Sequence, residues 1–492
     1  MKLYPCSLGI GLLISILPCL ISCSGKSTDQ KLNPSLLAQA HEDYKEVQIT
    51  QKRFGYETIK PLVENRGVEF SVATLGISVE GRPIHSLTYG RGALKVLLWS
   101  QMHGDESTAT MALFDLFNFF EGPSDDGYGD IRETINSHLT VKFIPMVNPD
   151  GAERFQRRNV LGIDLNRDAI RISSPEARIL REAREAFDPS FGFNLHDQNP
   201  YYNTEGSANP ATISVLAPAY NEATDINEVR EKAMKIIVGI NRILQVEIPG
   251  HVGKYNDSFE PRAFGDNFQK WGTSTILIES GGYPNDPEKQ YIRKLNFMIL
   301  LNALYEIATG EYNSYDREAY FSIPDNDSKL MDLIIRDVSL KYEDYTFQTD
   351  IGINRKAKES DEGYYYNGVI NDLGDLSIYH GYEEVQKSDL EIVMGKVYDG
   401  ELDWDELNWE KAVELLKEGY IAIKTSEENM GKLHDLPLKV FTGDQDLDPL
   451  PSLGSVAHFF LRENRELRYA VINGILVDLR KPEKLPVMGM VE

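Results

Sequence analysis

From about residue 39 to residue 310, short apolar runs alternate with longer segments that have helical spacing. The apolar runs, which we predict to be strands, are 95–99, 139–147, 191–196 and 274–278. The segments that we predict to be helices are 108–120, 175–187, 229–244 and 289–308. Strands that alternate with helices indicate an α/β domain whose sheet is covered by helices on both faces.

The pattern changes after Gly310. Residues 316–492 contain short β-like pieces separated by acidic turns, at 390–398, 419–425, 436–442, 457–462 and 468–479. One helix is expected at 405–419. We therefore predict a smaller, β-rich C-terminal domain at 316–492, of unknown role, that packs on the α/β domain or binds a partner. We expect it to carry no catalytic residue.

Composition narrows the possible functions. Hydrophobic residues make up 41% of the 492-residue chain, which is ordinary for a globular protein. The formal charge of -25 would repel phosphate backbones, so we expect no nucleic-acid binding. The three cysteines are Cys6, Cys19 and Cys23. The rest of the chain can therefore hold neither a disulfide nor a thiolate metal site, and His, Asp or Glu must bind any metal.

The N-terminus has the features of an export signal. Lys2 precedes an apolar run at 8–21, as in secretory signal peptides. Leu20-Ile21-Ser22-Cys23 resembles a bacterial lipobox, which implies cleavage before Cys23 and acylation of its thiol. We expect a lipoprotein signal peptide at 1–22, a flexible tether with lipidated Cys23 at 23–38, and an exported protein that is lipid-anchored to a bacterial membrane, periplasmic or at the cell surface. The alternative is a plain signal peptide with a chance cysteine.

The segment His103-Gly104-Asp105-Glu106 could supply two metal ligands, because residues three apart can converge where the chain turns. The same spacing occurs at His380 and Glu383, so the pair alone decides nothing. Only the first pair is followed by further polar motifs. These are Asn148-Pro149-Asp150-Gly151, an arginine cluster at 154–158, Asp164-Leu165-Asn166-Arg167, His196, and Glu279 at the end of an apolar run.

This ordered set, with Gly81-Arg82-Pro83-Ile84 upstream, resembles the zinc metallocarboxypeptidase family of the carboxypeptidase A type. The resemblance covers roughly residues 40–310. It implies an α/β fold with a mixed, largely eight-stranded sheet flanked by helices. It places a zinc carboxypeptidase-like catalytic domain at 39–315.

The resemblance also implies a metal and a base. His103, Glu106 and His196 would bind one Zn²⁺ and leave its fourth position open for water. Glu279 would deprotonate that water and later protonate the leaving amine. Arg157 or Arg158 would stabilise the oxyanion of the tetrahedral intermediate, and the compressed spacing leaves the choice between them open.

Further positions would bind the substrate. Asn166 and Arg167 would hold its terminal carboxylate. Tyr255 lies near where the family places a mobile tyrosine, and Asp266 lies near the family's specificity pocket. Asp105 stands where digestive members carry an arginine, which leaves the preferred terminal residue open.

We therefore expect a zinc-dependent metallocarboxypeptidase that acts on peptides with a free C-terminus and contacts a membrane through its lipid anchor. One alternative is a murein-peptide amidase or an acyl-amino-acid deacylase on the same scaffold. Another is a binding lipoprotein without activity, which the presence of all three ligands and Glu279 disfavours.

Overall fold

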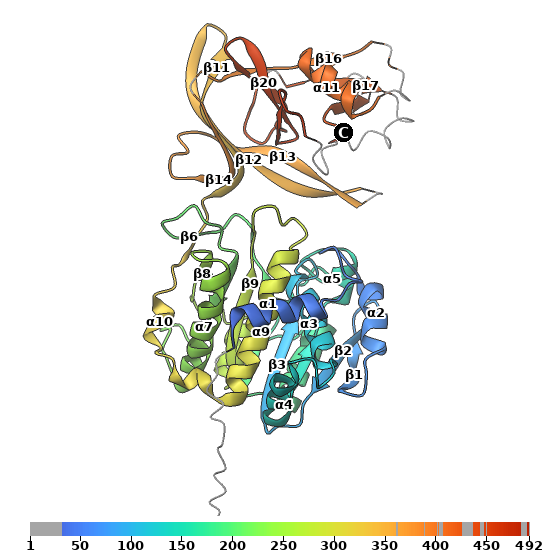
Figure 1. Cartoon of the computed structure of the whole chain (residues 1–492), viewed down its shortest axis with the longest axis vertical. Coiled ribbons are helices and arrows are strands. Elements are labelled where there is room, and N and C mark those ends of the chain that lie inside the picture. The colour runs from blue at the N-terminus through green and yellow to red at the C-terminus, as the bar shows by residue number, and fades with distance from the viewer. Residues whose placement is uncertain are drawn as a thin grey trace, which may run out of the picture.

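The computed structural model describes residues 32–360, 363–387, 389–400, 402, 407–425, 436–442, 447–448, 450–483 and 490–491. Within these ranges the chain forms an α/β region and a β-rich C-terminal region that follow one another along the long axis (Figure 1). The predicted signal peptide at 1–22 and Cys23 lie outside the described residues. No helix in the described ranges combines the length and the apolar character needed to cross a membrane.

A mixed sheet of eight strands runs through the α/β region. Its strands are β1 (Phe70–Ile77), β2 (Pro83–Tyr89), β3 (Leu94–Ser100), β4 (Leu139–Ile144), β5 (Phe191–Asp197), β7 (Ile213–Leu216), β8 (Val252–Lys254) and β9 (Ser274–Ser280). Their order is β1-β2-β4-β3-β5-β9-β7-β8. The central strands β4, β3, β5 and β9 are parallel neighbours, so their carboxyl ends meet at one edge of the sheet.

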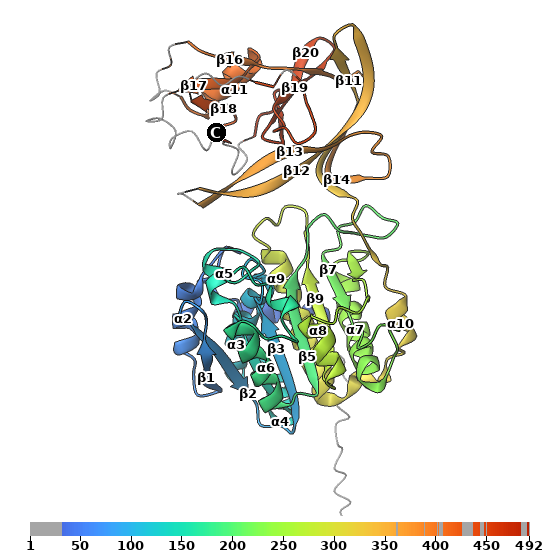
Figure 2. The ribbon, with the colours of Figure 1, turned by 180° about the vertical axis from the view of Figure 1, so that it is seen from behind.

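Helices cover both faces of this sheet, as the two opposite views show (Figures 1 and 2). They are α1 (Pro34–Tyr44), α2 (Tyr56–Glu64), α3 (Thr108–Phe120), α4 (Gly129–His138), α5 (Pro149–Glu153), α6 (Pro175–Phe187), α7 (Glu228–Glu247), α8 (Phe264–Lys270), α9 (Gln290–Thr309) and α10 (Glu318–Phe321). Short 3₁₀ turns lie at Leu165–Arg167 and Glu311–Ser314.

The alternation of side chains along β3 explains why the sheet is buried on both sides. Val96 and Leu98 point into one apolar core, which the buried residues of α3, α7 and α9 complete. Leu97 and Trp99 point into a second core, built with α6 and α8. Successive residues of a strand face opposite sides, so a continuous apolar run such as 94–99 is suited to a strand between two helical layers.

The C-terminal region contains two further sheets. The larger has β11 (Leu330–Tyr342), β12 (Tyr345–Ser360), β13 (Gly363–Gly374), β14 (His380–Gln386), β15 (Glu391–Val393), β19 (Phe459–Glu463), β20 (Glu466–Ile472) and β21 (Ile475–Asp478). The smaller has β16 (Lys396–Tyr398), β17 (Tyr420–Thr425), β18 (Lys439–Thr442) and β22 (Met490–Val491), with α11 (Trp409–Lys417) packed on β17. A two-stranded sheet pairs β6 (Asn203–Thr204) with β10 (Asn326–Asp327).

The predicted fold class is confirmed, an eight-stranded mixed α/β sheet followed by a β-rich region. The predicted bounds of α3 and α6 agree with the structure. Helical structure begins earlier than predicted, because Pro34 opens α1 within the segment 23–38 expected to be a tether, and Asn33 caps it. The longest strands of the C-terminal region, at 330–374, were not predicted, since their polar faces obscure the apolar alternation.

Candidate active site

The turn after β3 brings His103 and Glu106 together. The backbone N–H of Glu106 donates to the carbonyl of His103, and His103 Nδ1 lies 2.8 Å from Glu106 Oε1. Gly104 allows this turn to pass close to α5, because a Cβ there would lie 2.0 Å from the carbonyl carbon of Gly151. The pair at 380 and 383 lies instead on the extended strand β14, where residues three apart point to opposite faces.

His196 joins this pair from the carboxyl end of the neighbouring strand β5. Its Nδ1 lies 2.6 Å from Glu106 Oε2, and all three side chains are buried. One ligand atom from each of His103, Glu106 and His196 lies within 4.8 Å of the others. No other set of three His, Cys, Asp or Glu side chains in the described ranges converges in this way.

The chemistry around the triad fits a divalent cation. Burial alone would raise the pKa of Glu106, but the two histidines hold it well below its ordinary value. Burial disfavours a proton on His103, yet Glu106 and Asp164 raise its pKa to about 9. These anions therefore stabilise positive charge at the point where the three ligand atoms meet. Two imidazoles and one carboxylate are a typical catalytic zinc set.

Asp164 orients the first ligand. Its Oδ1 lies 3.1 Å from His103 Nε2 and accepts a hydrogen bond from the backbone N–H of Asn166. A carboxylate on the far nitrogen of a metal-binding histidine fixes the tautomer and the ring orientation. Asp164 belongs to the motif Asp164-Leu165-Asn166-Arg167, but no role was predicted for it from the sequence. The motif is the signal that could have identified it.

A cavity of about 410 Å³ opens onto the triad. It is lined by nine of the ten residues predicted for zinc binding, catalysis and substrate binding, namely His103, Glu106, Arg157, Asn166, Arg167, His196, Tyr255, Asp266 and Glu279. The tenth, Arg158, is not among the lining residues and donates to the carbonyl of Gly162 at the surface. The structure therefore places Arg157, and not Arg158, at the site.

Glu279 and Arg157 flank the triad within this cavity. Glu279 pairs with His196 in the register between β9 and β5, so both side chains leave the sheet at the same level. Burial, and then the charge of Glu106, raises the pKa of Glu279 above its ordinary value. The Arg157 guanidinium lies 3.1 Å from His103 Nδ1 and 3.2 Å from Glu106 Oε1.

The predicted substrate-binding residues have partners of their own. Asn166 Oδ1 accepts from the backbone N–H of Phe264, and Arg167 lies 3.4 Å from Glu260 in an ion pair. Burial raises the pKa of Asp266 to about 6. Glu260 was not identified from the sequence, where nothing distinguishes it from other surface acids.

Tyr255 packs edge-on against Tyr202, with ring centroids 6.0 Å apart. Tyr202 belongs, with Gln198 and Asn199, to a segment that lines the cavity and was not predicted. No local motif marks this segment, because its place at the site follows from the fold.

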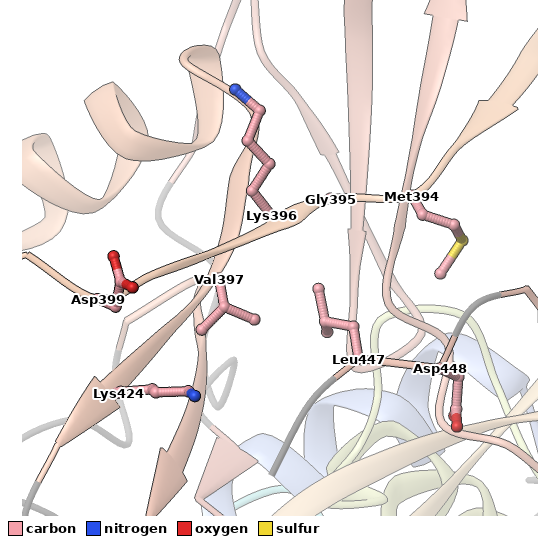
Figure 3. Close-up of a pocket in the computed structure, with 8 residues that line it drawn as sticks. All are labelled: Met394, Gly395, Lys396, Val397, Asp399, Lys424, Leu447 and Asp448. Carbon is pink, nitrogen blue, oxygen red and sulfur yellow. The ribbon is translucent and has the colours of Figure 1, made fainter. Parts of the chain in front are cut away.

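A second cavity of about 420 Å³ lies in the C-terminal region (Figure 3). Its lining includes Met394, Val397, Leu447 and Asp448, which Figure 3 shows together with Lys396 and Lys424. Among the residues that the structure describes, the three converging ligands lie at the first cavity.

Comparison with known proteins agrees with this site. Residues 56–233 match the family model described as zinc carboxypeptidase. This match confirms the resemblance seen in the sequence, a zinc peptidase as the class of enzyme, and zinc as the cofactor. No curated protein matches the chain.

Several solved structures are distantly similar. A metallo-carboxypeptidase from Burkholderia cenocepacia is 20% identical, with a TM-score of 0.41, over 52% of this chain and 70% of that one. A metallo-carboxypeptidase from Pseudomonas aeruginosa, in complex with (2-guanidinoethylmercapto)succinic acid, is 18% identical, with a TM-score of 0.39, over 52% of this chain and 69% of that one. Carboxypeptidase A from Helicoverpa armigera is 15% identical, with a TM-score of 0.38, over 56% and 80%.

Proposed function

We propose that this chain hydrolyses the C-terminal peptide bond of peptides. The proposal is supported by the match of residues 56–233 to the zinc carboxypeptidase family model. The observation that carries the proposal is a single cavity. It joins a buried metal triad to a carboxylate of raised pKa, Glu279, and to two arginines, Arg157 and Arg167. Hydrolysis of a terminal peptide bond requires such a set, a metal, a base, and cations for the oxyanion and the terminal carboxylate.

Each side chain has a defined task in this mechanism. Zinc, when bound by the triad, supplies Lewis acidity that polarises the scissile carbonyl and activates water. Glu279 accepts the proton of the attacking water and delivers it to the leaving amine, for which a raised pKa is suited. Arg157 donates hydrogen bonds to the oxyanion that develops on the carbonyl.

Asn166 and Arg167 bind the terminal carboxylate. Arg167 Nε lies 3.4 Å from Glu260 Oε2, and the Glu260 side chain is partly exposed, so this ion pair is weak. When the Arg167 guanidinium leaves Glu260, it can pair with both oxygens of the substrate carboxylate. Asp266, a carboxyl on the cavity wall, favours a terminal residue with a cationic side chain. Pairing with such a side chain would ionise the carboxyl, whose pKa is raised to about 6 by burial.

One observation favours the second candidate function, amide hydrolysis on murein peptides or acyl-amino acids. Because Arg167 already has an acidic partner in Glu260, the site would also accept a substrate without a terminal carboxylate beside the scissile bond. In either case we propose an exported enzyme that is lipid-anchored through Cys23, on the sequence motif alone.

Matched peptides with free or amidated C-termini test the proposal. The zinc-loaded chain from Ser24 would be incubated with both, and the products read by mass spectrometry, with Glu279→Ala as the inactive control. We expect one-residue losses from free-acid peptides only. Cleavage of amidated and free peptides alike, or of neither with zinc bound, would replace the carboxypeptidase with the second candidate.

A further inference from the structure

One segment links the active-site cavity to the C-terminal region. The chain leaves β5 at Asp197 and runs through residues 198–202 into β6. Gln198, Asn199 and Tyr202 line the cavity that contains the metal triad. Figure 1 shows the β6 end of the α/β region directed toward β14. We call residues 198–202 the wall segment.

The C-terminal sheet holds the opposite side of the wall segment. The Tyr201 hydroxyl donates to Asp332 Oδ2 on β11 at 2.5 Å and lies 3.0 Å from the carbonyl of Arg355 on β12. The backbone N–H of Leu330 donates to the carbonyl of Tyr201. The Tyr382 hydroxyl on β14 donates to the carbonyl of Pro200 at 2.6 Å. Three strands of one domain thus bind two adjacent residues of the other.

Asp332 is itself fixed in place. The same Oδ2 accepts the backbone N–H of Arg355 at 2.6 Å, and Arg355 is paired with Glu383 on β14. The Tyr201 hydroxyl therefore contacts a carboxylate that a backbone hydrogen bond already holds in place.

Strand β10, which lies between α10 and the C-terminal sheet, holds the start of the wall segment by hydrogen bonds. Asn326 of β10 donates to Gln198 Oε1 at 3.0 Å, and Ser214 on β7 donates to Asn326 Oδ1 at 2.8 Å. Gln198 also donates to Ser214 Oγ, which closes a ring of three side chains. Every residue of this ring is buried or partly buried, so the wall segment is held at both of its ends.

We propose that the C-terminal β-sheet positions one wall of the catalytic cleft, and that Tyr201 and Asp332 act as positioning residues. By holding the wall segment from outside, the sheet places Tyr202 against Tyr255 at the cavity. The C-terminal region then controls how the cleft binds substrate without contributing a group to the chemistry. This proposal rests on the proposed function for its kinetic part.

The alternative is that an external partner protein binds this sheet. Such a partner would need a corner of the sheet that the α/β region does not already contact. The contacts above argue against that at this corner, since the hydroxyls of Tyr201 and Tyr382 and the carboxylate of Asp332 are all used between the two regions. The other surfaces of the C-terminal region are unaffected by this argument.

Two mild variants, Tyr201→Phe and Asp332→Asn, test the coupling. Tyr345→Phe, in the same region but 74% exposed, is the matched control. We expect faster hydrogen–deuterium exchange in residues 198–204, unchanged zinc content, and KM raised about tenfold with kcat within about twofold. A positioning role predicts this split, because the wall segment lines the cavity and supplies neither a metal ligand nor the base.

The outcomes are distinguishable. Unchanged exchange and unchanged KM in both variants would overturn the proposal. So would an equal loss of kcat and zinc, which would indicate general unfolding of the site. If the wild-type protein cleaves no peptide, the proposed function fails. The exchange of residues 198–204 then still tests the coupling by itself.

Discussion

The replacement of Asp164 by asparagine tests whether this carboxylate tunes the metal site. Asp164 Oδ1 lies 3.1 Å from His103 Nε2 and its Oδ2 lies 3.1 Å from Arg157 Nε, while only 8% of the side chain is exposed. Asparagine preserves the shape but removes the charge. A hydrogen bond to an ionised group contributes about 1.5–3 kcal/mol and a neutral one about 0.5–1.5.

The hydrogen bond between residue 164 and His103 is therefore expected to weaken by about 1–2 kcal/mol. In addition, the asparagine amide would present a hydrogen-bond donor to Arg157, which is itself a donor. Both effects weaken zinc binding, which we expect to fall by about 10–100-fold, the range found for such outer partners. The assay is a competitive titration of zinc against a fluorescent chelator at neutral pH. It would be supported by the difference in Tm between the metal-free and the zinc-loaded protein.

Asp188→Asn is the matched control, since this side chain is 81% exposed and stands in a left-handed position that asparagine tolerates. It should leave zinc affinity unchanged. An affinity for Asp164→Asn within about threefold of wild type, with the fold intact, would refute the reasoning. The carboxylate would then support the turn at Asn166 and have no influence on the metal.

Three further predictions follow from particular side chains. Arg157→Ala should lower kcat by about 10²–10³-fold with zinc retained, whereas Arg158→Ala should not, and equal kinetics of the two variants would contradict the assignment. Asp266→Asn should lower kcat/KM for lysine-terminated peptides about 10–100-fold relative to leucine-terminated ones, and an unchanged ratio would remove Asp266 from the specificity pocket. His458 is buried, accepts the backbone N–H of Asn473 at Nδ1, and has its pKa lowered from 6.5 to about 3 by burial. His458 stays neutral in the folded protein, whereas in the unfolded chain it binds a proton below pH 6.5. The free energy of unfolding that the neutral His458 contributes is therefore complete above pH 6.5 and is lost as the pH falls toward 3. Calorimetry at pH 7 and pH 5 should show about 2 kcal/mol more acid destabilisation in wild type than in His458→Gln, and parallel curves would argue against it.

The amino-acid sequence was sufficient for features that depend on near neighbours. The apolar run of β3 and the spacing of α3 follow from periods of two and of 3.6 residues, which any short stretch of chain expresses. The metal ligands were predicted through the resemblance to zinc metallocarboxypeptidases, which rests on the order of the motifs from Gly81 to Glu279. The long strands at 330–374 were missed because their polar faces obscure the apolar alternation. The N-terminal helix was missed although Asn33 and Pro34 are local signals for its start, because the polar segment before it was interpreted as a tether.

Only the tertiary structure decided questions of direction and proximity. Arg157 and Arg158 are adjacent and chemically alike, and only the path of the chain through α5 sends one to the triad and the other to Gly162. The pairs at 103 and 380 have the same spacing, but a turn brings the side chains of one together and a strand separates those of the other. The contact between Tyr201 and Asp332 joins residues 131 positions apart. Periodicity is local, whereas a site depends on where side chains from separate elements meet, and that is determined by packing.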